Sequence, residues 1–144
     1  MECLKAQISD LISRSADGEL EKMIGGKNLD EYVEKILSLA EINLWTTSGK
    51  IEAIVATYAN DPERHEAFIT MVAVSPQYRK KGLAKSLIAA TLSNLSARKF
   101  KRCSLEVRSD NTDAIKLYHS IGFKDSNQSG EIIRMSIDLS ARNN

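Results

Sequence analysis

Residues 72–88 read VAVSPQYRKKGLAKSLI, in which an apolar run is followed by a proline turn, a cluster of cations, a glycine and an amphipathic segment. The apolar run belongs to residues 67–75, AFITMVAVS, which are typical of a strand buried on both faces. After the glycine, apolar residues recur at helical spacing until about Arg98. The stretch therefore predicts a buried strand, a basic loop and a long helix in succession.

The start of that helix is predicted to bind a phosphate group. The first turn of a helix has N–H groups without internal acceptors, and the helix dipole adds positive potential there. Gly82 and Ala84 are small enough to let a ligand approach the backbone closely. Four cations surround them: Arg79, Lys80, Lys81 and Lys85. The alternative interpretation is a basic turn that is only solvated. The glycine spacings of the Walker loop and of the dinucleotide-binding motif, which mark two common phosphate sites, are both absent.

The rest of the chain alternates between helical and strand-like patterns. We expect helices over about 4–12 and 30–40, a hairpin over 42–59, a strand over 67–75, a helix over 83–98, a strand over 103–108, a helix over 111–121 and a strand over 132–139. Two successive strand–helix units and a closing strand predict a single-domain α/β protein with a mixed sheet flanked by helices.

Length and composition indicate one soluble domain. The chain has 144 residues, 42% of them hydrophobic, and a formal net charge of +1. We expect a helical part over residues 1–41, a sheet and cofactor-binding core over 42–139 and a tail over 140–144. Near-neutrality argues against nucleic acid or membrane partners, and the acidic start of the chain is unlike a signal peptide, so a cytoplasmic protein is expected.

The sulfur and imidazole side chains are few and widely separated. Cys3 and Cys103 are the two cysteines, and we expect both to be free, buried thiols. Neither they nor the two histidines, His65 and His119, have the spacing that a zinc site needs, so no metal is predicted.

A second stretch, LEVRSDNTDAIKLYHSIGFK over residues 105–124, completes a family resemblance. Residues 79–84, RKKGLA, match [RQ]-x-x-G-x-[GA], the hallmark of the GNAT superfamily of acyl-CoA-dependent N-acyltransferases. The second stretch resembles the later signature of that family through Leu105, Val107, Asn111, Ala114, Leu117, Tyr118, Gly122 and Phe123. The resemblance covers about residues 42–139, and LEVR is similar to the bacterial ribosomal-protein alanine N-acetyltransferase branch. It implies a GNAT-like fold with a mixed, mostly antiparallel sheet.

The resemblance implies transfer of an acetyl group from acetyl-CoA to a primary amine by direct attack. It implies that backbone groups of the strand before the loop, Val72, Ala73 and Val74, bind the pantetheine arm of the cofactor. The pyrophosphate is then expected on the N–H groups of Lys81, Gly82, Leu83, Ala84 and Lys85, with Arg79 and Lys80 nearby. Asn111 is implied to hydrogen-bond the cofactor, although asparagine is also an ordinary helix N-cap.

Tyr118 and Glu106 are the implied catalytic residues. A phenol titrates near pH ~10 and a thiol near ~8.5, so a tyrosine can donate a hydrogen bond or its proton to the departing thiolate. The alternative for Tyr118 is a core tyrosine with its hydroxyl at the rim. Glu106 matches the family branch's general base, whereas the alternative is an ion pair with Arg108 or with a cation on a neighbouring strand.

The acceptor amine stays open between a peptide α-amine and a small-molecule amine. Deprotonating a lysine side chain at pH 7.5 costs about 4 kcal/mol, whereas an α-amine costs under about 1, so one carboxylate base favours the latter. A catalytically silent CoA-binding module, a longer acyl donor and a nucleotide-binding protein are the alternatives. The resemblance also implies a possible homodimer through sheet edges or through the strand IIRMSIDL.

Overall fold

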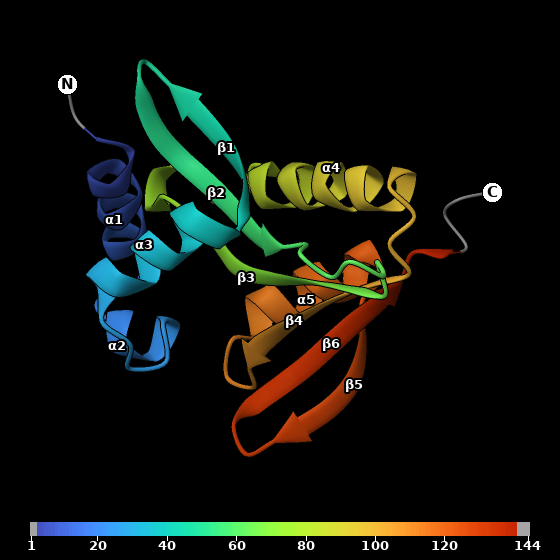
Figure 1. Ribbon diagram of the computed structural model, residues 1–144. Coiled ribbons are helices and arrows are strands. Elements are labelled where there is room, and N and C mark those ends of the chain that lie inside the picture. Colours follow the sequence, from blue (N-terminus) through green and yellow to red (C-terminus); the bar gives the residue numbers. More distant parts are fainter. Residues whose placement is uncertain (1–2, 141–144) are drawn as a thin grey trace. The chain divides into compact units, whose positions relative to one another are not determined.

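The computed structural model describes residues 3–140 (Figure 1). Its chain divides into two compact units, each of which is described by itself. The first contains the residues up to Ala56 together with Met71–Leu87, and the second contains Thr57–Thr70 together with the residues from Ile88 onward. The predicted domain boundaries at residues 41 and 139 stay predictions. No helix among the described residues has the length and apolar character needed to cross a bilayer.

The strands form a six-stranded sheet in the order β1-β2-β3-β4-β6-β5. Their bounds are Glu41–Thr47 for β1, Lys50–Tyr58 for β2, Glu66–Val74 for β3, Arg102–Arg108 for β4, Lys124–Ser129 for β5 and Ile132–Asp138 for β6. β3 pairs with β4 in parallel, whereas β6 is antiparallel to both β4 and β5. The predicted α/β class with a mixed, mostly antiparallel sheet is therefore confirmed.

The first unit contains three N-terminal helices, α1 (Leu4–Ser15), α2 (Leu20–Met23) and α3 (Leu29–Leu39). Asn28 caps α3 by accepting the N–H of Glu31 at 3.0 Å. α1 and α3 lie side by side (Figure 1). Their apolar faces share one core with strands β2 and β3, which includes Ile8, Leu11, Ile12, Val33, Ile36, Ile54, Met71 and Ala73. The helical N-terminal region is thus confirmed.

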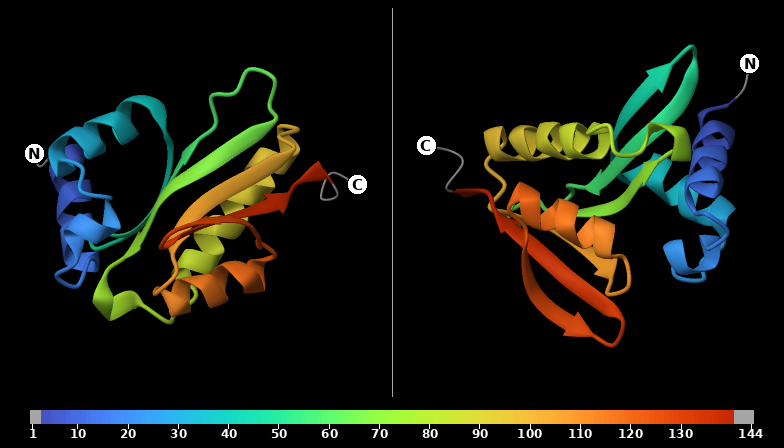
Figure 2. Two further views of the ribbon diagram at one scale, coloured as in Figure 1. Left: turned by 90° about the horizontal axis from the view of Figure 1, so that it is seen from below. Right: turned by 180° about the vertical axis from the view of Figure 1, so that it is seen from behind.

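The second unit is built around β4, and β6 lies between β4 and β5 (Figure 2). Cys103 and Leu105 of β4 are in register with Ile137 and Met135 of β6, and all four side chains are buried. The helix α5 (Thr112–Ile121) ends at Gly122, whose φ of +123° favours glycine. A Cβ at that position would lie 3.1 Å from Ile137 Cδ1, so glycine also permits close packing there.

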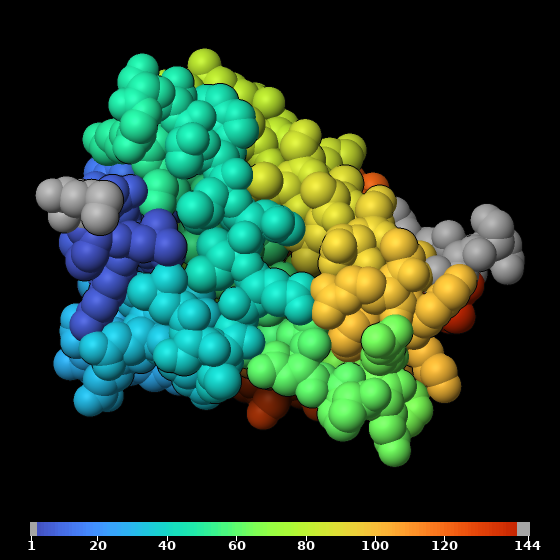
Figure 3. Space-filling view, turned by 45° about the horizontal axis from the view of Figure 1, so that its top comes forward, coloured from blue at the N-terminus to red at the C-terminus, as the bar shows by residue number. Residues whose placement is uncertain are grey.

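The polar loop before β3 is held by local hydrogen bonds. Asp61 accepts the N–H groups of Glu63 at 2.9 Å, His65 at 3.1 Å and Glu66 at 3.3 Å. The backbone N–H of Glu63 and those of the other two residues lower the pKa of Asp61. Arg64 donates to the carbonyl of Arg98, and the loop (green) lies beside the residues after α4 (orange) in Figure 3.

Four expectations differ from the structure. The short helix α2 and the strand β5 were not expected. The β5 sequence, KDSNQS, has no apolar residue to indicate a strand, and all six of its side chains are exposed. β6 is an internal strand, so IIRMSIDL is not a sheet edge. β2 is almost wholly buried, while β3 alternates between buried and half-buried residues, so the prediction for residues 67–75 was wrong about one face. Cys3 is exposed, where it accepts an N–H at the start of α1, and Cys103 is buried as expected.

Candidate cofactor-binding and catalytic site

The basic loop begins where β3 ends. The N–H of Ser75 donates to the carbonyl of Glu52 at 2.9 Å, and the short 3₁₀ helix η1 (Pro76–Tyr78) follows. Proline suits this position because it needs no N–H partner there. Lys80 and Gly82 then adopt left-handed conformations with φ of +60° and +79°. These two residues turn the chain into the helix α4 (Leu83–Ala97), as the sequence predicted for residues 83–98.

The backbone in front of α4 is open to a ligand. The N–H of Ser86 donates to the carbonyl of Gly82 at 3.0 Å, so the N–H groups of residues 82–85 precede the hydrogen-bond ladder of the helix. A Cβ at Gly82 would meet no atom within 4 Å. The predicted cradle residues Leu83 and Ala84 are half-buried, and the lysines at 80, 81 and 85 are exposed. This geometry suits an anion that approaches the helix start.

Arg79 does not project freely from the loop. Its Nη1 donates to Asp17 Oδ2 at 2.6 Å, its Nη2 donates to the carbonyl of Ser15, and its Nε lies 3.4 Å from the carbonyl of Val74. All four residues belong to the first unit. The guanidinium is therefore already bound by one carboxylate and two backbone carbonyls.

The strand predicted to bind the pantetheine arm occupies the same unit. Ala73 is buried, whereas Val72 and Val74 are half-buried. Arg79 contacts the carbonyl of Val74. It does not contact the backbone groups of Val72 and Ala73.

Two features of the first unit were missed by the sequence analysis. Trp45 and Tyr78 pack edge to face with ring centroids 5.1 Å apart, and Lys81 Nζ lies 6.0 Å from the Tyr78 ring centroid. Glu52, in β2, is buried, and its Oε1 forms an ion pair with Arg14 Nη1 at 3.2 Å. Seven consecutive residues of β2 are buried, so the strand has no alternation of polar and apolar positions that could have pointed to the pair of Arg14 and Glu52.

Tyr118 lies in the second unit on the buried face of α5. Its side chain is 8% exposed and packs edge to face on Phe123, with ring centroids 6.1 Å apart. Burial raises the pKa of Tyr118 to about 12, because the phenolate would be poorly solvated. The tyrosine is therefore fully protonated at neutral pH and is a hydrogen-bond donor rather than a ready source of protons.

Asn111 is the N-cap of α5. Its Oδ1 accepts the N–H of Ala114 at 3.3 Å, which fits the capping role that the sequence left open beside cofactor binding.

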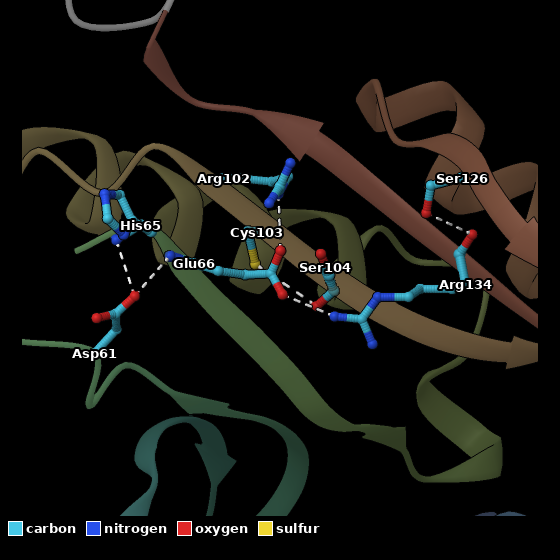
Figure 4. Close-up of polar contacts among 8 residues, drawn as sticks. All are labelled: Asp61, His65, Glu66, Arg102, Cys103, Ser104, Ser126 and Arg134. Atoms are coloured by element: carbon cyan, nitrogen blue, oxygen red, sulfur yellow. Dashed lines mark hydrogen bonds and ion pairs between the residues drawn. The ribbon is translucent and has the colours of Figure 1, made fainter. Parts of the chain in front are cut away.

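Glu106 belongs to a charged network on one face of the strands in the second unit. Glu106 Oε2 lies 3.5 Å from Arg134 Nη1, and the two residues are register partners on β4 and β6. Arg134 Nη2 also lies 2.8 Å from Glu66 Oε1, while Arg102 Nε donates to Glu66 Oε2 at 2.7 Å (Figure 4). Of the two alternatives for Glu106, the ion pair is made with Arg134 rather than with Arg108.

The network shifts the pKa of Glu66, whose side chain is partly buried. Burial raises the pKa of Glu66, but the hydrogen bond and charge of Arg102 and the charge of Arg134 outweigh it, so the pKa lies below its usual value. Arg134 also stacks on Phe68, with its Cζ 5.3 Å from the ring centroid. Cys103, on the opposite face of β4, has its pKa raised to about 12 by burial, so its thiol is not a nucleophile at neutral pH.

A model of the acetyltransferase (GNAT) family matches residues 19–123. This segment is most of the chain and contains both motifs, and the protein belongs to this family. The class predicted from the two motifs is therefore confirmed. Members of the family use acetyl-CoA.

Two similar curated proteins carry the same enzyme name. The [ribosomal protein bS18]-alanine N-acetyltransferase of Haemophilus ducreyi is 45% identical over 58 residues, or 40% of each chain. That of Escherichia coli K12 is 35% identical over 81 residues, which are 56% of this chain and 53% of the relative. The chain thus matches about half the length of these relatives or less.

Solved structures with the same fold cover nearly the whole chain. The ribosomal-protein-S18-alanine N-acetyltransferase from Escherichia coli superposes with a TM-score of 0.77 at 22% identity, covering 97% of this chain and 91% of that chain. The PaiA N-acetyltransferase from Thermoplasma acidophilum, solved in complex with coenzyme A, gives a TM-score of 0.75 at 13% identity and covers 93% and 92%. At these identities the likeness establishes the fold alone.

Proposed function

We propose that the protein is an acetyl-CoA-dependent N-acetyltransferase that transfers the acetyl group to a primary amine by direct attack. The observation that carries the proposal is the open start of α4, where left-handed Gly82 exposes backbone N–H groups between exposed lysines. Family membership supports the same reaction. In this reaction the amine nitrogen forms a bond to the thioester carbonyl carbon, and the carbon–sulfur bond then breaks to release CoA.

The cofactor is proposed to bind mainly through backbone groups. The N–H groups of residues 81–85 receive the pyrophosphate, with the side chains of Lys80, Lys81 and Lys85 adding charge. The backbone of Val72 and Ala73 receives the pantetheine arm. We propose that Arg79 holds the loop in place, since its guanidinium is already bound by Asp17, and that Asn111 acts first as a helix cap.

Tyr118 is proposed to stabilise the departing thiolate by a hydrogen bond. Complete proton transfer from a phenol with a pKa of about 12 to a thiolate whose conjugate acid has a pKa of about 8.5 is uphill by about 5 kcal/mol. A donated hydrogen bond has no such cost and still lowers the energy of the developing negative charge. The thiolate then takes its proton from water.

Glu106 is proposed to accept, through a water molecule, the proton that the attacking nitrogen loses. Its side chain is half exposed, which leaves room for a water molecule beside it. The ion pair with Arg134 fixes the carboxylate on the surface of the strand. A purely structural ion pair is the competing role, and the Glu106→Gln variant separates the two through its effect on the rate.

The acceptor is proposed to be a peptide α-amine, as in a protein N-terminus. The segment that is 35% identical to the bS18-alanine N-acetyltransferase of Escherichia coli supports this class of acceptor. The lower cost of deprotonating an α-amine, under about 1 kcal/mol at pH 7.5 against about 4 for lysine, supports it independently.

Thiol release tests the proposal directly. Purified protein is incubated with acetyl-CoA and each of three acceptors: a peptide with a free N-terminal alanine, the same peptide with a blocked N-terminus and one internal lysine, and an amino sugar. We expect turnover with the first peptide only. Turnover with the amino sugar alone would overturn the peptide acceptor, and CoA binding without any turnover would favour a silent CoA-binding module.

A further inference from the structure

Arg79 joins three segments of the first unit. Its three nitrogen atoms contact the carboxylate of Asp17, the carbonyl of Ser15 and the carbonyl of Val74. Ser15 is the last residue of α1, and Val74 is the last residue of β3. The arginine that begins the R-x-x-G-x-A motif is thus bound to a helix end that lies more than sixty residues earlier in the chain.

The contacts are those that a helix C-terminus favours. The last carbonyls of a helix have no internal partners, and the negative end of the helix dipole attracts a cation. Arg79 occupies that position at α1 and binds Ser15 there. Asp17, which follows with a left-handed φ of +52°, places its carboxylate against the same guanidinium. Residues 15–17 therefore surround Arg79 on the side where α1 ends.

A second cation ties the same helix end to the strand beside the loop. Arg14 donates to the side chain of Glu52 at 3.2 Å and to the carbonyl of Ile51 at 3.1 Å. The carbonyl of Glu52 in turn accepts the N–H of Ser75, the first residue after β3. Movement of the α1 end would therefore disturb both ends of the segment from Ser75 to Arg79.

We propose that Arg79 is a positioning residue that couples cofactor binding at residues 80–85 to the order of residues 15–19, the end of α1 and its connection to α2. This inference rests on the proposed function, because it takes CoA as the ligand of the loop. It assigns to the motif arginine a role through Asp17 and Ser15 rather than a direct contact with phosphate. Coupling is reciprocal, so CoA binding must order residues 15–19 as much as their order favours CoA.

The two roles of Arg79 predict opposite signs for one substitution. If Arg79 bound phosphate directly, Asp17 would compete for it, and Asp17→Asn would strengthen CoA binding. If Arg79 positions the loop, Asp17→Asn loosens it and weakens CoA binding. Because the pair is partly exposed, with side-chain exposures of 37% and 62%, we expect a loss of about two- to fivefold.

The experiment measures CoA affinity by calorimetry for the unmodified protein and for Asp17→Asn, Arg79→Gln and the double variant. Glu19→Gln is the matched control, because Glu19 lies two residues after Asp17, carries the same charge and pairs with Lys22 at 3.7 Å rather than with Arg79. We expect about tenfold weaker binding for Arg79→Gln and no further loss in the double variant. Glu19→Gln should leave the affinity unchanged.

Hydrogen exchange provides a readout that a general loss of stability does not imitate. The N–H of Ala16 donates to Ser13 and that of Glu19 donates to Ala16, so both amides report on the segment. CoA should slow their exchange in the unmodified protein and fail to do so in Asp17→Asn. Stronger binding by Asp17→Asn, or unchanged exchange at residues 15–19, would overturn the coupling alone. Absence of CoA binding by the unmodified protein would overturn the proposed function and the coupling with it.

Discussion

The lysines of residues 80–85 and the charged network of the second unit use cations in opposite ways. Lys80, Lys81 and Lys85 are exposed, and none of them forms an ion pair within residues 3–140. In the network, two arginines face two glutamates at distances of 2.7 to 3.5 Å. Cations that repel one another lower stability unless an anion arrives, whereas compensated charges stabilise the fold without a ligand. The difference supports the proposal that the three lysines bind an anion.

The largest effect is expected from Gly82→Leu. A leucine strains the left-handed backbone at this position and blocks the close approach of the pyrophosphate. The substitution should therefore reduce CoA affinity by at least about a hundredfold, since several charge-assisted hydrogen bonds depend on that geometry. Titration calorimetry measures the affinity. Gly49→Leu is the matched control, because Gly49 has a φ of +76° and equally open space. Both variants should lose about 1–2 kcal/mol of stability, and equal loss of CoA binding in both would break the assignment of the loop.

Tyr118→Phe should reduce kcat by about tenfold to a hundredfold, because the thiolate loses a hydrogen-bond donor. The dissociation constant for CoA should stay within about twofold, measured beside the steady-state rate. Tyr32→Phe removes the hydroxyl of another buried tyrosine, which is 7% exposed, and should leave kcat unchanged. An unaltered kcat in Tyr118→Phe would leave this tyrosine as a packing residue only.

Lys85→Gln and Arg102→Gln sharpen the contrast between the two clusters. The first should weaken CoA binding by about two- to fivefold at low salt, with the difference shrinking at high salt, and should not lower the melting temperature. The second should leave CoA affinity unchanged and cost up to about 1 kcal/mol, because it removes a partner of Glu66. Calorimetry measures the CoA affinity of each variant, and thermal melts measure its stability. A loss of stability in Lys85→Gln together with a loss of CoA affinity in Arg102→Gln would contradict the contrast between the two clusters.

The smallest effect concerns acid stability. The pKa of Glu66 is lower in the folded protein than its ordinary value of 4.5, so its ion pairs stabilise the fold above that pH and are lost as the pH falls through the folded pKa. Glu66→Gln should lower stability by about 0.5–1 kcal/mol at pH 7 and by less at pH 3. Urea melts at the two pH values measure this. A penalty that is equal at both pH values would mean that the charge of Glu66 contributes nothing.

Local signals explain which parts of the molecule were predictable. Proline at position 76, glycine at 82 and helical spacing after it define the loop, because each acts within a few residues. The same holds for the cap and stop of α5 at Asn111 and Gly122. The strand, the loop and the start of α4 were therefore predicted from sequence, whereas the left-handed φ of Gly82 comes from the structure and CoA binding by the loop stays a proposal.

Long-range partners were not predictable from one sequence. No pattern near residue 79 points to Asp17, and Arg134 becomes a partner of Glu106 only through the register of β4 and β6. Cys3 was expected to be buried because cysteine usually is, yet at the start of α1 its sulfur serves as a cap instead. The strand β5 was missed because a polar edge strand lacks the alternation that reveals a half-buried one.

That polar strand has a consequence for the protein at high concentration. A sheet edge offers its free backbone groups to strands of other molecules, and flat apolar edges promote aggregation. β5 instead has the sequence KDSNQS, exposes every side chain and changes register against β6 between Asp125 and Asn127. Solvated side chains and an irregular backbone make this edge a poor template for strands from other molecules, so the absence of apolar residues in β5 protects the fold from uncontrolled growth of its sheet.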